Sequence, residues 1–178
     1  SFRGPEHLWV EWDVSQNPER SNPALLQVQQ PVRIGESSQG GVSRTMLVES
    51  TERIADGVLR VRLKAPDGRD LPRWTPGSHI DLHCGDTGIS RQYSLCGDDG
   101  RWRIGILHER AGRGGSDHLF RTAHVGTELQ VSLPRNNFQL EEAAEYVFVA
   151  GGIGITPILP MIAAAESAGA DWTLYYGG

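Results

Sequence analysis

Cysteine, long apolar runs and an excess of positive charge are all scarce in this sequence of 178 residues. Cys84 and Cys96 are its two cysteines, too few for a disulfide framework or a metal site of their own. We therefore expect reduced thiols in a cytoplasmic protein, with no metal bound. No apolar run approaches the roughly 20 residues of a membrane-spanning helix. With a net charge of −5, the chain also lacks the basic footprint of a nucleic-acid-binding protein.

Glycine, in contrast, is abundant, with 22 residues. This is about 12% of the chain against a usual share near 7%, and it suggests many turns or a backbone that approaches a ligand closely. At roughly 100–200 residues per domain, the length allows one full domain and part of another. The sequence opens with neither a methionine nor a secretory signal, so we expect that its first residue is not the native start.

The sequence divides into three regions that differ in the pattern of their apolar and polar residues. Residues 1–42 contain scattered prolines, and their apolar residues keep neither a helical nor a strand periodicity. We therefore expect an irregular arm that ends in a flexible linker. The alternative is a stretch without fixed structure, but Trp9 and Trp12 favour docking of part of the arm. We expect a β-barrel over residues 43–140 and the start of a nucleotide-binding α/β domain over residues 145–178.

Short alternating runs fill the second region. Val58–Leu63 and His79–His83 alternate apolar and polar residues, as half-buried strands do. About six such runs, separated by glycine and proline, predict a small antiparallel barrel that makes the chain mainly β. One helix interrupts the strands, and Ser116 is its predicted N-cap.

In the third region the spacing of the apolar residues changes. Tyr146–Ala150 is a continuous apolar run, the pattern of a strand buried on both faces. A helix is predicted to start with Thr156 as N-cap and Pro157 in its first turn, and to end at Gly169. A strand at Thr173–Tyr176 completes a strand–helix–strand unit, which requires a parallel sheet. One sheet face and both edges would stay bare, so we expect the remaining strands to be cut off, disordered or supplied by another chain.

A first motif, Arg91-Gln92-Tyr93-Ser94, lies on a predicted strand. Arg91 offers a guanidinium fork for phosphate. Tyr93 shares its strand face and offers an aromatic plane, while Ser94 offers a hydroxyl donor. These residue types suit a planar, anionic ligand, although an ordinary strand with a cross-strand tyrosine is the alternative.

A second motif, from Gly112 to Ser116, is a glycine turn at the start of the predicted helix. Such a turn exposes backbone N–H groups where the helix dipole favours anions, and Arg110 and Arg113 add positive charge. A plain capped helix is the alternative interpretation.

A third motif, from Gly151 to Pro157, joins the parallel strand to its helix. Open α/β sheets bind ligands at this end of their strands. Thr156 replaces the last glycine of the dinucleotide fingerprint, and no lysine makes the segment a P-loop. Glycines at three of four positions favour backbone access to a ligand over a merely tight turn.

Together and in this order, the motifs resemble those of one known family. It is the phthalate dioxygenase reductase and vanillate demethylase reductase group of the ferredoxin–NADP reductase superfamily. The resemblance covers about three quarters of the chain, from Arg44 to Gly178, whereas the arm before it resembles nothing identified. The matching stretches are Pro76–Asp81, Arg91–Cys96, Gly112–Ser116, Leu133–Phe138 and Val149–Pro157.

The resemblance implies a flavin barrel followed by an NADH domain. It places Arg91 toward the flavin phosphate, Tyr93 against the isoalloxazine ring and Ser94 near flavin N5. The glycine turn would bind the phosphate, and the third motif would line the nicotinamide side. The implied cofactor-binding residues are Arg91, Gln92, Tyr93, Ser94, Gly114, Gly115, Ser116, Gly152, Gly154, Thr156 and Pro157. We expect no acid–base residue essential to hydride transfer, because the flavin carries that chemistry.

The implied function is that of a flavin-dependent, NADH-oxidising reductase component of an oxygenase system. Electrons would pass from NADH through flavin to an iron–sulfur or haem partner. A [2Fe–2S] cluster would require a missing C-terminal domain, since this sequence has no cysteine motif for one. One alternative is a flavin-binding subunit or fragment that is inactive alone and docks on a partner chain. Another is a barrel that has lost flavin and serves as a scaffold.

The flavin itself is predicted to be FMN rather than FAD. A terminal dianionic phosphate needs several N–H donors and an arginine, which Gly114, Gly115, Ser116 and Arg91 supply. FAD would also need an aromatic or apolar surface on which its adenine could stack. No aromatic residue lies between Trp102 and Phe120 to provide one. FAD remains the alternative, because Trp9 or Trp12 could stack on adenine. The resemblance also favours FMN.

Overall fold

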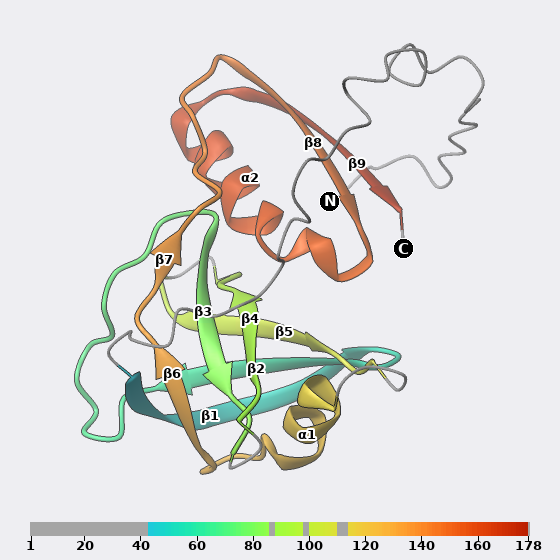
Figure 1. Cartoon of the computed structure of the whole chain (residues 1–178). Coiled ribbons are helices and arrows are strands. Elements are labelled where there is room, and N and C mark those ends of the chain that lie inside the picture. Colours follow the sequence, from blue (N-terminus) through green and yellow to red (C-terminus); the bar gives the residue numbers. More distant parts are fainter. Residues whose placement is uncertain (1–42, 86–87, 98–99, 110–113, 178) are drawn as a thin grey trace, which may run out of the picture. The chain divides into compact units, whose positions relative to one another are not determined.

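The computed structural model describes residues 43–85, 88–97, 100–109 and 114–177 (Figure 1). The predicted arm over 1–42, with Trp9 and Trp12, lies outside the described residues, and so do Arg110 and Arg113. The described residues fall within one compact unit. The domain boundary predicted between residues 140 and 145 lies inside this unit and stays a prediction.

An antiparallel sheet makes up the first part of the described chain. Its strands pair in the order β4-β3-β6-β1-β2-β5, and the short β7 pairs with β3. The bounds are β1 (Ser43–Ala55), β2 (Val58–Lys64), β3 (Ser78–His83), β4 (Ser90–Ser94), β5 (Trp102–Leu107), β6 (Glu128–Ser132) and β7 (Arg135–Asn136). The mainly β, antiparallel character predicted from the alternating runs is confirmed.

The two end strands of this sheet, β4 and β5, are not joined by a strand ladder in the described residues. The predicted closure into a barrel is therefore wrong at this seam. Just after β4, the Leu95 amide donates to Ser78 O on β3 at 2.9 Å, so the chain stays with β3. A backbone bond from Cys96 N to Arg103 O at 2.9 Å then reaches β5.

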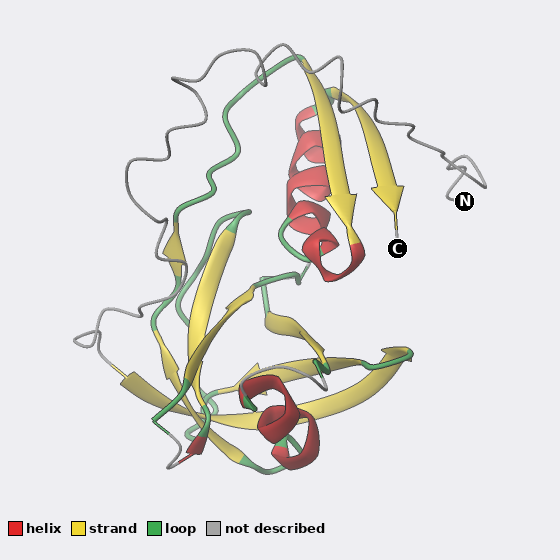
Figure 2. Cartoon of the chain, turned by 45° about the vertical axis from the view of Figure 1, so that its right-hand side comes forward, coloured by secondary structure: helices red, strands yellow, loops and turns green. Residues whose placement is uncertain are grey.

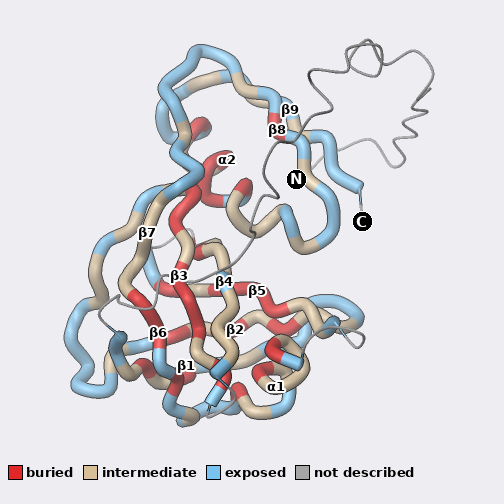
Figure 3. The backbone as a smooth tube through the Cα atoms, in the orientation of Figure 1, coloured by how far each residue is buried: buried red, intermediate tan, exposed pale blue. Residues whose placement is uncertain are grey.

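The core of this sheet follows largely from the alternation. Val61 on β2 and Ile80 and Leu82 on β3 are fully buried, and the neighbours of Val61 are only partly covered. Asp81, between Ile80 and Leu82, is buried as well, on the opposite face of β3. Trp102 on β5 is also fully buried, and its indole donates to Pro72 O at 3.0 Å. Figure 3 shows buried residues along β3, β5 and β6. This packed core gives β4 a rigid support.

Helix α1 (Gly115–Thr122) packs against the same core through Leu119. Ser116 was predicted as its N-cap, and this is wrong. The N-cap is Gly114, with φ 86° in the left-handed region that glycine tolerates. The Ser116 hydroxyl instead accepts a hydrogen bond from the Glu109 amide at 3.2 Å. The helix therefore begins two residues earlier than predicted, within the glycine motif.

A second, parallel sheet pairs β8 (Glu145–Gly151) with β9 (Asp171–Gly177). Helix α2 (Ile158–Ala168) packs on one face of this sheet (Figure 2). Phe148 on β8 and Met161 on α2 belong to the same buried cluster. The predicted strand–helix–strand unit is confirmed. The other face is bare, with Val147 62% and Val149 74% exposed. The expectation of a strand buried on both faces is therefore wrong within the described residues, because one helix covers only one face.

The turn between β8 and α2 also differs from its prediction. Gly152–Ile155 form a 3-10 turn, labelled η4. Thr156 has helical dihedral angles, and its hydroxyl donates back to Ile153 O at 2.9 Å, so it does not cap the helix. Gly169, with φ 71°, ends α2 as predicted.

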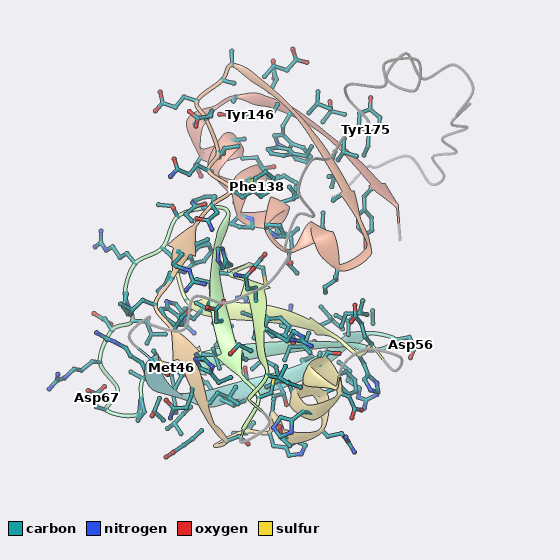
Figure 4. All side chains as sticks on the ribbon, viewed as in Figure 1. Met46, Asp56, Asp67, Phe138, Tyr146 and Tyr175 are labelled. Atoms are coloured by element: carbon teal, nitrogen blue, oxygen red, sulfur yellow. The ribbon has the colours of Figure 1, made fainter. Side chains whose placement is uncertain are left out.

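An ion pair and hydrogen bonds hold the segment after β6 against β3 and the loop before it, ahead of the second sheet. Arg135 on β7 donates to the buried carboxylate of Asp81 at 2.6 Å. The Asn136 amide donates to Thr75 Oγ1 and Pro76 O, both at 2.8 Å. These bonds hold β7 and the start of the connection that carries Phe138, which Figure 4 labels. In the part of the chain that the structure describes, no helix is long and apolar enough to span a membrane.

Candidate functional site

A cavity of about 330 Å³ brings the three sequence motifs together. Its volume falls within the roughly 300–1,000 Å³ of small-molecule sites. The predicted site residues that line it are Arg91, Gln92, Tyr93, Ser94, Ser116, Gly154, Thr156 and Pro157. Three of the predicted residues, Gly114, Gly115 and Gly152, lie next to this wall in sequence but do not line the cavity.

Arg91 lies against the first turn of α1. A Cβ at Gly115 would stand only 3.0 Å from Arg91 Cγ and 3.1 Å from Arg91 Nε. Glycine at this position therefore makes room for the arginine stem. The guanidinium also donates to the Ser90 carbonyl at 2.9 Å. A fixed positive charge thus lies beside a helix N-terminus, an arrangement that suits a phosphate.

Tyr93 is two residues from Arg91 on β4 and shares its strand face, as alternation predicted. It pairs across the ladder with Ile80, a core residue. Burial, then the Cys84 thiol, raise the pKa of Tyr93 above its usual range, although the Arg91 charge opposes them. The phenol therefore stays protonated at neutral pH, so its ring enters the site without charge.

The first turn of α1 supplies backbone donors. The first bond of the helix runs from His118 N to Gly114 O at 2.9 Å, so the amides of Gly115, Ser116 and Asp117 have no partner within the helix. Glu109 also lines the cavity, and its negative charge is unfavourable for a phosphate. Sequence reasoning missed Glu109, for which no motif gave a signal.

The opposite wall comes from η4 and the start of α2. Gly105 on β5 faces this wall, and a Cβ there would stand 3.0 Å from Thr156 Cγ2 and 3.1 Å from Ile153 Cδ1. Sequence reasoning also missed Gly105 and Leu107, which line the cavity together with Ile153 of the third motif. A glycine inside a strand marks a close approach of another segment, so Gly105 was the one of them that carried a signal.

Comparisons with known proteins identify relatives of this chain. No family model matches it. The vanillate O-demethylase oxidoreductase of Pseudomonas putida is 44% identical over 126 residues, which are 68% of this chain and 39% of that protein. The chain thus spans about two fifths of the length of the curated relatives it matches.

The chain resembles many solved structures, among them a dioxygenase reductase and a cytochrome P450 monooxygenase. Phthalate dioxygenase reductase, described as modular for electron transfer from pyridine nucleotides to [2Fe–2S], is 35% identical with a TM-score of 0.71. That match covers 75% of this chain and 43% of the reductase. An intact type IV self-sufficient cytochrome P450 monooxygenase is 49% identical with a TM-score of 0.73, and the match covers 99% of this chain and 23% of that one.

An antiparallel sheet followed by a parallel strand–helix–strand unit is the fold that the chain shares with reductases of the ferredoxin–NADP reductase superfamily. Within this superfamily, the chain belongs to the phthalate dioxygenase reductase and vanillate demethylase reductase family, as its motifs predicted. The similarity to the P450 monooxygenase covers nearly the whole sequence, so it includes the region of residues 1–42.

Proposed function

We propose that this chain is the flavin-binding part of an NAD(P)H-dependent reductase component of an oxygenase system. Electrons pass from NADH through flavin to an iron–sulfur or haem protein. The observation that carries the proposal is the cavity in which Arg91–Ser94, Ser116 and Gly154–Pro157 meet, although they come from segments far apart in the sequence. The relatives named as oxidoreductase and dioxygenase reductase support the same activity.

The residues around the cavity fit a flavin. Arg91 and the amides of the first turn of α1, including Gly115 and Ser116 after the Gly114 cap, would hold the phosphate. Tyr93 would lie against the ring system, and Ser94 would lie near its N5. When bound, the flavin would accept a hydride and release its electrons one at a time.

The η4 turn and the start of α2 would meet the nicotinamide of the electron donor. Gly154, Thr156 and Pro157 line the cavity here, and Gly152 precedes them at φ 49°. Gly105 allows this wall to approach β5 closely. In this proposal, residues 43–140 form the flavin domain and residues 145–178 begin the NAD(P)H domain.

We further propose that the flavin is FMN. The donors beside Arg91 sit at a helix N-terminus, which suits a terminal phosphate with its two negative charges. FAD is the alternative, with a pyrophosphate and an adenine that would need further contacts. Release of the flavin by heat, followed by chromatography, identifies it, and an FAD peak would contradict the phosphate assignment.

The electron acceptor is proposed to be an oxygenase or a ferredoxin-type protein. Of the two structural relatives, one transfers electrons to a [2Fe–2S] centre and the other is a cytochrome P450 monooxygenase. Cys84 and Cys96 are not joined in a disulfide, which fits the proposed cytoplasmic location. The alternative function is a flavin-binding subunit that turns over only when it is docked on a partner chain.

Anaerobic mixing of the flavin-loaded chain with NADH tests the proposed function. We expect the flavin absorbance to bleach in a reaction that saturates with NADH, and the electrons then to reduce a one-electron acceptor such as cytochrome c. Bleaching by dithionite but not by NADH would contradict the NADH-oxidising activity of this chain and favour the inactive subunit.

We expect Gly115→Ala to weaken flavin binding severalfold without lowering stability. The new Cβ would displace Arg91, which is a flexible side chain, by a few tenths of an ångström. Alanine is also the better helix former, by about 1 kcal/mol within a helix. Titration calorimetry with FMN and thermal melting measure the two effects. An unchanged FMN affinity would mean that Arg91 is not held by this contact.

A further inference from the structure

His79 lies on β3 directly behind the proposed flavin site. In the β-ladder its Cα partner on β4 is Ser94, and its partner on β7 is Arg135. Directly paired residues point to the same face of a sheet, so His79 and Ser94 share a face. Asp81, two residues further along β3, belongs to this face as well.

A second cavity of about 260 Å³ joins these two residues. His79 and Ser94 both line it, together with Gln92, Phe138 and Pro157. Ser94, Gln92 and Pro157 also line the first cavity. Ser94 therefore stands between the proposed flavin site and His79.

The face that carries His79 has unmet hydrogen-bonding capacity. Two buried side-chain atoms lack a hydrogen-bond partner in the described part of the chain, and both belong to this face: His79 Nε2 and Asp81 Oδ1. A buried polar atom without a partner destabilises the folded protein. A cavity of this volume has room for several waters. Water in this cavity would supply His79 Nε2 with a partner that carries protons.

We propose that His79 accepts the proton that leaves the reduced flavin through Ser94 when the flavin is reoxidised. This inference rests on the proposed function. Reoxidation delivers two electrons, singly, to a one-electron acceptor, and one proton leaves flavin N5. The Ser94 hydroxyl takes up this proton as its own moves through cavity water to His79 Nε2. His79 then releases the proton to solvent and is neutral again, so charge and atoms balance.

The surroundings of His79 keep its imidazole neutral, the form that can take up a proton and release it again. Burial and the positive charge of Arg135 lower the pKa of His79, and the negative charge of Asp81 opposes them only in part. The residues that face His79 from β4 and from the β7–β8 connection, Ser94, Gln92 and Phe138, are uncharged. The imidazole is therefore neutral at neutral pH and is ready to accept a proton.

The test compares His79→Gln with wild type and with His124→Gln, which replaces an exposed histidine outside the site. Each flavin-loaded protein is reduced photochemically, without NADH, and then reoxidised by ferricyanide in H₂O and in D₂O across a pH series. We expect His79→Gln to slow reoxidation by about 10²-fold, the lower end for a positioned proton-transfer group. We also expect the pH dependence of the wild-type rate to disappear and added imidazole to restore part of the rate.

Three further results decide the proposal. Flavin affinity and melting temperature should stay at wild-type values in His79→Gln. Ser94→Ala should slow reoxidation as well, and the double variant should be no slower than the slower single variant, because both act on one route. NMR titration should show His79, in the oxidised and reduced proteins, with a pKa that depends on the redox state.

Equal reoxidation rates and equal pH profiles for wild type and His79→Gln would overturn this inference and leave the proposed function intact. Failure to bind flavin, or failure to reduce it with NADH, would instead contradict the proposed function. If His79→Gln does not fold, His79→Asn and the imidazole rescue of His79→Ala give the same decision.

Discussion

Replacement of Arg91 by alanine is expected to weaken flavin binding by about 1.5–3 kcal/mol, the range for a hydrogen bond to a charged group. Every 1.4 kcal/mol is a tenfold change in Kd, so this is roughly 10–150-fold. The reason is geometric as well as electrostatic. The arginine stem packs on Gly115, and its guanidinium stands beside the first turn of α1, where the phosphate would bind.

Two further variants make the Arg91 prediction specific. Arg91→Lys keeps the positive charge but loses the planar guanidinium, which can bind a phosphate through two N–H groups at once. Its FMN affinity should therefore lie between those of wild type and Arg91→Ala. Arg69→Ala removes an arginine whose side chain is 85% exposed and paired with Asp67, and it should bind FMN like wild type. Calorimetric titration with FMN measures all three. Wild-type affinity in Arg91→Ala would show that the phosphate binds elsewhere.

Gly77→Ala is expected to be strongly destabilising, with a loss of about 2–6 kcal/mol from backbone strain and overpacking together. Gly77 has φ +90°, where an L side chain is strained by about 1–3 kcal/mol. A Cβ there would also stand 1.8 Å from Phe138 O and 2.9 Å from Met161 Cε. Overpacking of this kind adds about 1–3 kcal/mol, and here the blocked atom belongs to the backbone, which cannot rotate away.

Gly126→Ala is the matched control. Gly126 has φ +87°, but a Cβ there would meet nothing within 4 Å. Its cost should therefore be the backbone strain alone, about 1–3 kcal/mol. Urea denaturation of wild type and both variants gives the free energies of unfolding. Equal losses in the two variants would show that Phe138 moves aside without cost and that the connection beyond β7 is not held as described.

Much of the fold could be predicted from the sequence because alternation is a strong signal. Val58–Leu63 and His79–His83 became β2 and β3 since one face of each run had to enter the core. Helix starts were less predictable. A cap is worth only about 1 kcal/mol, so the left-handed Gly114 and the Glu109 amide were enough to draw Ser116 into the helix. Closure of the sheet into a barrel between β4 and β5 depends on a few backbone hydrogen bonds, which the pattern of side chains does not predict.

The candidate site could be predicted where side-chain chemistry defines it, and less so where backbone proximity does. The motif at Arg91–Ser94 was found from its residue types and lines the cavity. Gly105 and Ile153 entered it only because β5 and η4 approach each other, which is a tertiary contact. Glu109 is an acidic residue in a site expected to be positive, and charge reasoning alone would have excluded it.

Titration of the purified, flavin-free chain with FMN, FAD and riboflavin tests the central claim most directly. The account predicts that FMN binds with one-to-one stoichiometry and more tightly than FAD. It also predicts that riboflavin, which lacks the phosphate, binds wild type about as weakly as FMN binds Arg91→Ala. No saturable binding of any flavin, or equal affinity for FMN and riboflavin together with no effect of Arg91→Ala, would contradict the assignment of this cavity as a flavin site.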